Sequence, residues 1–140
     1  MTFQIIHERE DASDVFAAIR RGIREADPPD VGARDYAPVF LSLRDDDGAI
    51  LGGLYGATMW KWLMIEGLWV AREQQRRGHG SRLLTAAESQ ALERGCVGAS
   101  LGTFDFQARA FYERHGYRVV GELVGFPEGH SHFQLAKRFG

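Results

Sequence analysis

The chain has 140 residues, a length typical of one domain and sufficient to bury a core without disulfides or a structural metal. Apolar residues make up 44% and charged residues 26% of the sequence, the ordinary range for a globular protein. Seventeen basic and nineteen acidic residues give a formal charge of -2, so the chain lacks the cationic field that would hold a nucleic-acid backbone. We therefore expect a single domain over residues 1–140 and no nucleic-acid partner.

The cysteine content and the hydropathy pattern limit where the protein works. Cys96 is the only cysteine, which excludes an intrachain disulfide and zinc sites built from several thiolates, and favours a reduced, cytoplasmic location. No run of about 18 apolar residues occurs, so we expect no membrane association. His130 and His132 lie on one side of a predicted strand, but two imidazoles without a third ligand predict no metal site.

The N-terminal half predicts one strand, one helix and then three further strands. Residues 2–7 have the pattern of a strand, and a helix follows from Asp11, whose side chain can cap its first turn, to Ala26. Residues 38–44, 49–59 and 63–70 are strand-like runs separated by short turns. Their close succession predicts a three-stranded antiparallel meander.

In the second half, helices and strands alternate. A charged, glycine-containing loop over residues 72–81 leads into a helix, and residues 97–103 return to a strand. A second helix is expected over residues 105–115, and two closing strands over residues 117–124 and 132–137. This order predicts an α/β or α+β fold, with a mixed, mostly antiparallel sheet of about seven strands and helices on both faces.

One segment, Gln75-Arg76-Arg77-Gly78-His79-Gly80-Ser81, has the character of an anion-binding turn. It lies between a predicted strand and a predicted helix, where free backbone N–H groups and the positive end of the helix dipole favour an anion. Its two glycines let the backbone approach a diphosphate closely, and its arginines add positive charge. The same residues also suit an ordinary helix start with solvated arginines, and spacing alone does not separate the two interpretations.

Two motifs, in order, resemble those of the GNAT acyltransferases. Residues 68–70 followed by residues 75–80 resemble the family's Gln/Arg-x-x-Gly-x-Gly/Ala motif and the strand before it. Residues 108–117 are similar to the family's Ala-x-x-Phe-Tyr-x-x-x-Gly-Phe/Tyr segment. The resemblance is strong over residues 62–117, and it implies a sheet splayed between two central strands, with acetyl-CoA entering the gap.

The resemblance also implies which residues contact acetyl-CoA. Backbone groups of Leu68, Trp69 and Val70 would contact the pantetheine arm and the thioester. The candidate contacts in the diphosphate loop are Gln75, Arg76, Arg77, Gly78, His79, Gly80 and Ser81. Asp105 and Phe111 complete the set. Asp105 stands where the family often has Asn, and because a carboxylate cannot donate a hydrogen bond, we expect Asp105 to act as a helix N-cap.

Two residues are candidates for the chemistry of amide formation. The reaction needs a base to deprotonate an alkylammonium and benefits from an acid that protonates the departing thiolate. The resemblance places Tyr112 beside the coenzyme sulfur, as the candidate acid, whereas the alternative is an aromatic residue of the core. Glu66 has the strand parity of Leu68 and is the candidate base, although a water chain could serve instead.

The sequence therefore predicts an acetyl-CoA-dependent N-acetyltransferase that acts on a primary amine, in the first instance of a small molecule. Acetylation of a protein lysine or N-terminus is one alternative. A non-catalytic acyl-CoA-binding module is the other. A homodimer would bury the strand edges and aromatic side chains that a small domain exposes.

Overall fold

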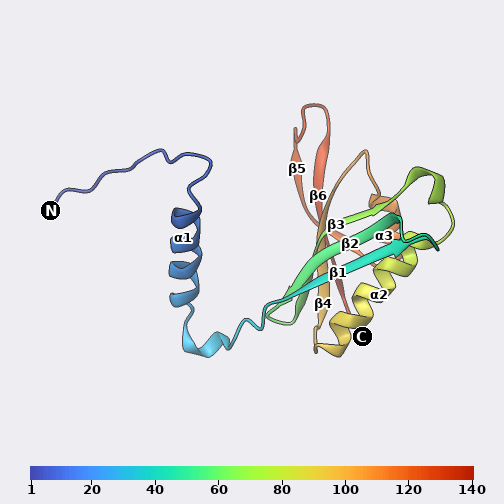
Figure 1. Cartoon of the computed structure of the whole chain (residues 1–140), viewed down its shortest axis with the longest axis horizontal. Helices are drawn as coiled ribbons and strands as arrows, with labels where there is room; N and C mark the ends of the chain where they lie inside the picture. The colour runs from blue at the N-terminus through green and yellow to red at the C-terminus, as the bar shows by residue number, and fades with distance from the viewer. The chain divides into compact units, whose positions relative to one another are not determined.

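The computed structural model describes all residues from Met1 to Gly140, and the chain divides into two compact units, Met1–Ala33 and Arg34–Gly140. Figure 1 shows their elements. The prediction that residues 1–140 act as one domain stays a prediction. No helix is both long enough and apolar enough to cross a lipid bilayer.

The first unit contains helix α1 (Ser13–Glu25) and the short 3-10 helix η1 (Pro29–Val31). The predicted strand over residues 2–7 is wrong, because these residues form no strand in the structure. Their sequence alternates correctly, but a strand also needs a neighbouring strand to complete its hydrogen bonds. The helix ends as predicted, whereas its N-cap is Ala12 and not Asp11, without a capping side chain.

The second unit is built on one sheet with the strand order β1-β2-β3-β4-β6-β5. Its strands are β1 (Ala37–Arg44), β2 (Ile50–Met59), β3 (Trp62–Val70), β4 (Gly98–Phe104), β5 (Arg118–Val124) and β6 (Ser131–Arg138). All neighbouring strands are antiparallel except β3 and β4, which are parallel. The mixed, mostly antiparallel α+β fold is therefore confirmed, with six strands in place of about seven.

One helix, α2 (His79–Glu93), supplies much of the core of this unit. It runs along β1, β2 and β3 (Figure 1), and the side chains that it buries are Leu83, Leu84, Ala87 and Ala91. Their spacing of three and four residues places them on one side of the helix. They pack against fully buried strand residues such as Leu63 and Leu135.

The other helix of the second unit, α3 (Arg109–Arg114), is shorter than the predicted helix over residues 105–115. It begins after Ala108, so the prediction that Asp105 is its N-cap is wrong. A partly buried polar contact fixes the chain that follows this helix. The Tyr117 hydroxyl donates to a Glu88 carboxylate oxygen of α2 at 2.7 Å, and Lys137 Nζ of β6 donates to the other at 2.8 Å.

The pairing of β3 with β4 is short, and this shapes the centre of the sheet. The two strands are in register only from Trp62 opposite Gly98 to Ile65 opposite Leu101. At that point a β-bulge at Glu66 shifts the register between β2 and β3. Beyond it β3 continues beside β2, and β4 continues beside β6, so a gap opens between β3 and β4.

We predict that Leu84→Ala lowers the free energy of unfolding by about 2–5 kcal/mol, because it leaves a cavity at a fully buried position of α2. The matched control is Leu92→Ala on the same helix, where the side chain is 54% exposed and little packing is lost. Urea denaturation followed by circular dichroism measures both values. Equal losses in the two variants would contradict the packing of α2 on the sheet.

Candidate functional site

The loop between β3 and α2 has an unusual backbone. It contains the 3-10 helix η2 (Arg72–Gln74), followed by Arg76 with φ of 62° and Gly78 with φ of 82°. Left-handed residues in such a turn direct neighbouring N–H groups to one side, which makes a concave anion site. Since α2 starts at His79, the N–H groups of its first turn also have no acceptor within the helix.

A cavity of about 760 Å³ lies beside this loop. It is lined by Leu68, Val70, Gln74, Gln75, Arg76, Gly78, His79, Gly80, Ser81, Phe106, Gln107, Ala108, Phe111, Tyr112 and Arg114. The lining combines the end of β3, the loop, the first turn of α2 and helix α3. The structure thus brings together the predicted site residues of both sequence motifs, with the exceptions described below.

A second, smaller cavity of about 260 Å³ lies in the gap between β3 and β4. Its lining residues are Ile65, Glu66, Gly67, Leu68, Leu101, Gly102, Thr103, Gln107, Ala108 and Tyr112. Leu68, Gln107, Ala108 and Tyr112 line both cavities, so the two adjoin. The two candidate catalytic residues, Glu66 and Tyr112, therefore face the same small space.

The two sequence motifs contact each other at the first turn of α2. The ring of Phe111 lies against Gly80, where an added Cβ would be 3.4 Å from its Cε1 and Cζ atoms. Ser81 Oγ and His115 Nε2 form a hydrogen bond of 2.9 Å. The end of β3 is joined to the loop as well, because Gln75 Nε2 donates to the Val70 carbonyl oxygen at 3.0 Å.

Tyr112 is buried, with 7% of its surface exposed, and its ring packs edge-on against Phe111 and Tyr117. Burial raises the pKa of the Tyr112 phenol above its ordinary value of 10.0. Burial, together with the Glu88 carboxylate, also raises the pKa of Tyr117. At neutral pH, Tyr112 therefore presents a protonated hydroxyl group from the wall shared by the two cavities.

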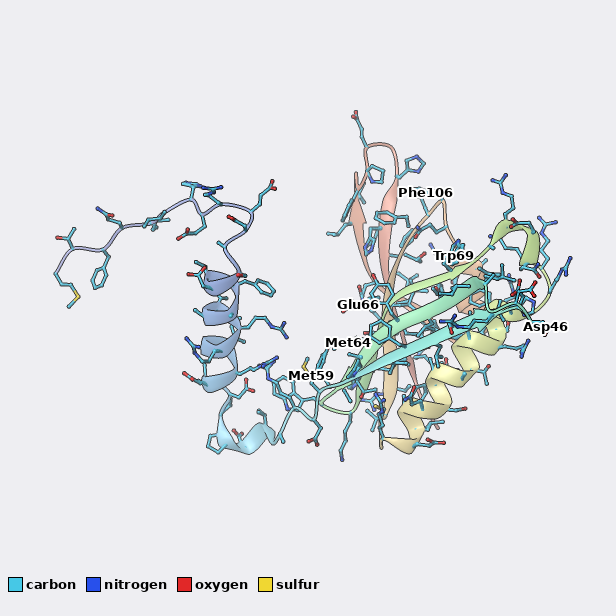
Figure 2. The ribbon with its side chains drawn as sticks, viewed as in Figure 1. Asp46, Met59, Met64, Glu66, Trp69 and Phe106 are labelled. Carbon is cyan, nitrogen blue, oxygen red and sulfur yellow. The ribbon has the colours of Figure 1, made fainter.

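The orientation of the Glu66 side chain is set by the bulge and not by the strand alternation that the sequence predicted. Ile65 and Leu68 both pack on the core, so the bulge at Glu66 interrupts the alternation of side chains along β3. Simple parity with Leu68 therefore does not describe its orientation. The Glu66 side chain is exposed and lines the gap between β3 and β4; Figure 2 labels it on β3 together with Trp69.

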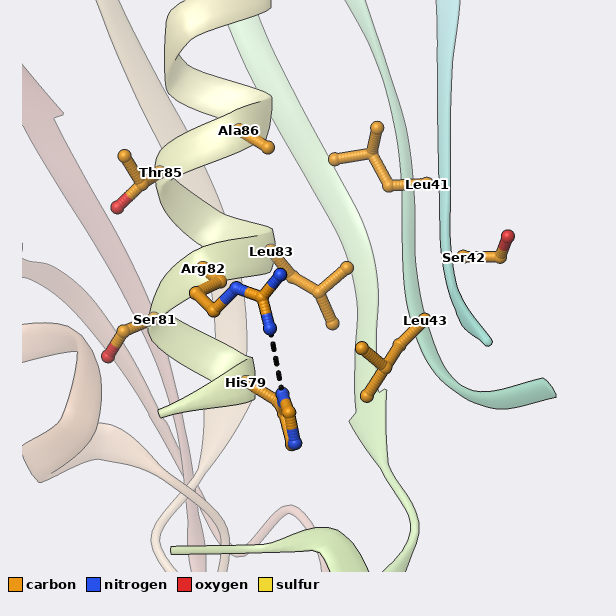
Figure 3. A pocket seen from close by; sticks show the side chains of 9 residues that line it. All are labelled: Leu41, Ser42, Leu43, His79, Ser81, Arg82, Leu83, Thr85 and Ala86. Atoms are coloured by element: carbon orange, nitrogen blue, oxygen red, sulfur yellow. Dashed lines mark hydrogen bonds between the residues drawn. The ribbon is translucent and has the colours of Figure 1, made fainter. Parts of the chain in front are cut away.

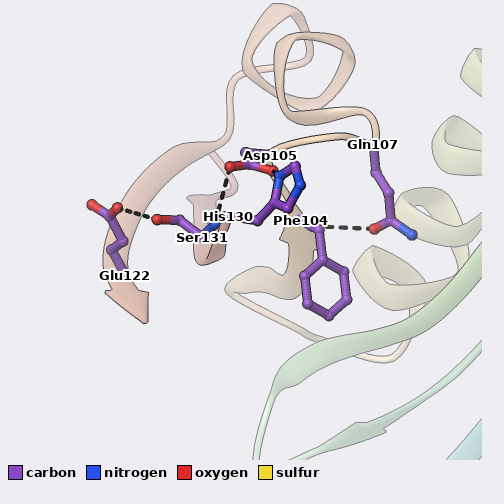
Figure 4. A network of polar contacts seen from close by, with 6 residues as sticks. All are labelled: Phe104, Asp105, Gln107, Glu122, His130 and Ser131. Atoms are coloured by element: carbon purple, nitrogen blue, oxygen red, sulfur yellow. Dashed lines mark hydrogen bonds and ion pairs between the residues drawn. The ribbon is translucent and has the colours of Figure 1, made fainter. Parts of the chain in front are cut away.

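Three predicted contacts of acetyl-CoA do not line the large cavity. Trp69 is 56% exposed and lines a separate pocket together with Phe40 and Tyr55. Arg77 NH1 donates to Gln74 Oε1 at 3.4 Å. The Asp105 carboxylate accepts the Ser131 N–H at 3.0 Å and lies 2.8 Å from His130 Nδ1 (Figure 4). It is thereby tied to the β5–β6 hairpin.

The arginine that follows the loop motif also lies elsewhere. Arg82 NH1 is 3.4 Å from His79 Nδ1, beside a different cavity of about 570 Å³ between α2 and β1 (Figure 3). The cationic side chains that line the large cavity are Arg76 and Arg114. Positive charge near the loop therefore comes partly from α3, which the sequence did not predict.

Gln107 is a site residue that sequence reasoning missed. Its Oε1 accepts the Phe104 N–H at 3.1 Å and the Thr103 hydroxyl at 3.3 Å, so it fixes the turn between β4 and α3 (Figure 4). It lines both cavities. Its position directly before the Ala108–Tyr117 motif was the available signal, but the polarity of a single residue predicts no contact.

Comparison with known proteins identifies the architecture. The model of the acetyltransferase (GNAT) family matches residues 5–117. The chain belongs to the GNAT family. As a member of it, the chain is an N-acetyltransferase with acetyl-CoA as co-substrate, as the two motifs predicted.

Individual relatives agree with this membership. Blasticidin-S acetyltransferase of Streptomyces morookaense is 38% identical over 130 residues, covering 91% of this chain and 90% of the relative. Acetyltransferase Atu2258 of Agrobacterium fabrum is 36% identical over 108 residues, covering 77% of this chain and 79% of the relative. A crystal structure of a putative acetyltransferase from Agrobacterium tumefaciens is 33% identical, covers 99% of this chain and 100% of that chain, and has a TM-score of 0.88.

We predict that the GNAT protein loses stability as the pH rises above about 10, because the unfolded chain then ionises tyrosines that the folded chain keeps protonated. The raised pKa values of Tyr112 and Tyr117 both act in this direction. Above the ordinary value of 10.0, the unfolded chain binds fewer protons at these two tyrosines than the folded chain does. Urea denaturation between about pH 8 and pH 11 measures the slope. Tyr117→Phe should reduce the slope, and an unchanged slope in this variant would contradict the burial of Tyr117.

Proposed function

We propose that this GNAT protein transfers the acetyl group of acetyl-CoA to a primary amine of a small molecule by direct attack. The observation that carries the proposal is the small cavity between β3 and β4. It joins the larger cleft, and it is lined by both a carboxylate, Glu66, and a protonated phenol, Tyr112. A site with these two groups can remove a proton at one point and supply one at another.

The donor side fits acetyl-CoA in its chemistry. The left-handed turn and the first turn of α2 offer backbone N–H groups to a diphosphate, and Arg76 and Arg114 add positive charge. The edge of β3 from Glu66 to Val70 faces the gap with no pairing to β4. Apart from the Val70 carbonyl oxygen, which accepts from Gln75, its backbone groups are therefore available to bind the amides of the pantetheine arm. Leu68, Trp69 and Val70 would provide these backbone contacts.

The chemical step then needs three proton transfers. Glu66, directly or through a water molecule, takes a proton from the acceptor ammonium, and the neutral amine attacks the thioester carbonyl carbon. The C–N bond forms and the C–S bond breaks as Tyr112 donates its proton to the departing sulfur. The nitrogen that attacked then loses its extra proton to the Tyr112 oxygen, which restores the phenol. The balance is one acetyl group transferred, one thiol released and one proton passed to the base.

The small-molecule acceptor is supported by the similarity to blasticidin-S acetyltransferase, which aligns with 91% of this chain. The small cavity also has room for a terminal amine and the few atoms that precede it. Blasticidin S is therefore the first acceptor to test. A lysine-containing peptide tests the alternative of a protein acceptor.

We predict that acetyl-CoA binds with a Kd on the order of micromolar and that Gly80→Glu weakens binding at least about 100-fold. An added Cβ at Gly80 meets only the edge of the Phe111 ring at 3.4 Å, so the variant should fold. The new carboxylate would repel the diphosphate. Gly22→Glu is the matched control, because it adds the same side chain at a helical glycine of α1 with nothing within 4 Å.

Isothermal titration calorimetry on all three proteins measures these values, and thermal unfolding checks that Gly80→Glu is folded. Wild-type protein that fails to bind acetyl-CoA would contradict the proposed function. Equal weakening by Gly22→Glu would show that the effect of Gly80→Glu does not come from the loop.

We predict that Tyr112→Phe lowers kcat for acetyl transfer by about 10²–10⁴-fold without weakening acetyl-CoA binding, because only the transferable proton is lost. Glu66→Gln should also lower kcat, because the amide cannot accept the proton of the acceptor ammonium. Release of free thiol from acetyl-CoA, with blasticidin S as acceptor, measures the rate. Acetyl-CoA binding without turnover of either blasticidin S or the peptide would favour a binding module, and an unchanged rate in Tyr112→Phe would remove it as the acid.

A further inference from the structure

A hydrogen bond joins Ser81, which lines the large cavity, to His115, which does not. Ser81 belongs to the first turn of α2 and lines the large cavity, whereas His115 is the C-cap residue of α3. The imidazole is half-buried, packs 4.8 Å from the Phe111 ring and holds its Nε2 atom 2.9 Å from Ser81 Oγ. Its backbone N–H is fixed by the Tyr112 carbonyl at 2.9 Å.

The direction of this hydrogen bond decides what Ser81 can offer to a ligand. A serine hydroxyl has one proton to donate and two lone pairs that accept. If His115 Nε2 carries no proton, Ser81 donates to it and turns only lone pairs toward the cavity, which disfavours phosphate oxygens. If Nε2 carries a proton, Ser81 accepts from His115 and its own proton is free for a phosphate oxygen.

We propose that His115 is a positioning residue for acetyl-CoA: its Nε2–H donates to Ser81 and so directs the Ser81 hydroxyl proton toward the diphosphate. This inference rests on the proposed function, which places the diphosphate at the loop between β3 and α2. His115 does not itself contact the ligand. It acts through Ser81, and the contact between α2 and α3 sets the distance between them.

The neutral imidazole has an N–H group on only one ring nitrogen, whereas imidazolium has an N–H group on both. The proposed arrangement therefore requires a form of His115 that carries a proton on Nε2.

A double-mutant cycle tests the inference, with acetyl-CoA Kd measured by calorimetry. Ser81→Ala should weaken binding about tenfold, because it removes a hydrogen bond to a charged group, and His115→Phe about threefold, because the Ser81 hydroxyl stays but loses its fixed direction. The double variant should be no weaker than Ser81→Ala. His115→Phe keeps a ring against Phe111, and His115→Gln, which can still donate, should restore most of the affinity.

Independent losses that multiply in the double variant would overturn the inference, as would a His115→Phe protein that binds like the wild type. If His115→Phe does not fold, ¹⁵N NMR of the wild-type imidazole decides the question. Acetyl-CoA should place a proton on His115 Nε2, and an Nε2 that stays bare in the complex overturns the proposal. Wild-type protein that does not bind acetyl-CoA at all would instead refute the proposed function.

Discussion

The parallel pairing of β3 with β4 stops after Ile65 and Leu101, and the candidate site depends on this early end. Two parallel strands that stayed in register would satisfy each other's backbone groups and leave no space between them. The bulge at Glu66 marks the point where β3 leaves β4, and it also directs a carboxylate into the gap. The same irregularity therefore creates an unpaired strand edge and places a candidate base beside it.

The contact of α3 with the first turn of α2 explains why two motifs separated in the sequence act as one. Gly80 accommodates the Phe111 ring, and Ser81 bonds to His115, so the diphosphate loop and the helix that carries Tyr112 are fixed to each other. The proposed chemical end and the proposed anion-binding end of the cleft are thus coupled by packing.

Most of the second unit was predictable because its signals are local. The meander over residues 38–70 and the loop before α2 follow from strand patterns, turns and glycines within short windows. The failures involve partners distant in sequence: residues 2–7 lack a neighbouring strand, and Asp105 binds His130 and Ser131 instead of capping α3. The bulge at Glu66 is equally invisible in the sequence. A homodimer and a cytoplasmic location stay predictions.

The two sides of the reaction differ in how strongly the sequence specifies them. Binding of a diphosphate uses backbone N–H groups, so it requires glycines and a left-handed turn at fixed positions, and a short motif records these requirements. In the proposed reaction, recognition of an acceptor would use side chains from β3, β4 and the turn at Gln107, which are brought together only by the fold. The family can therefore keep its donor while changing its acceptor, because the residues that bind each are subject to different constraints.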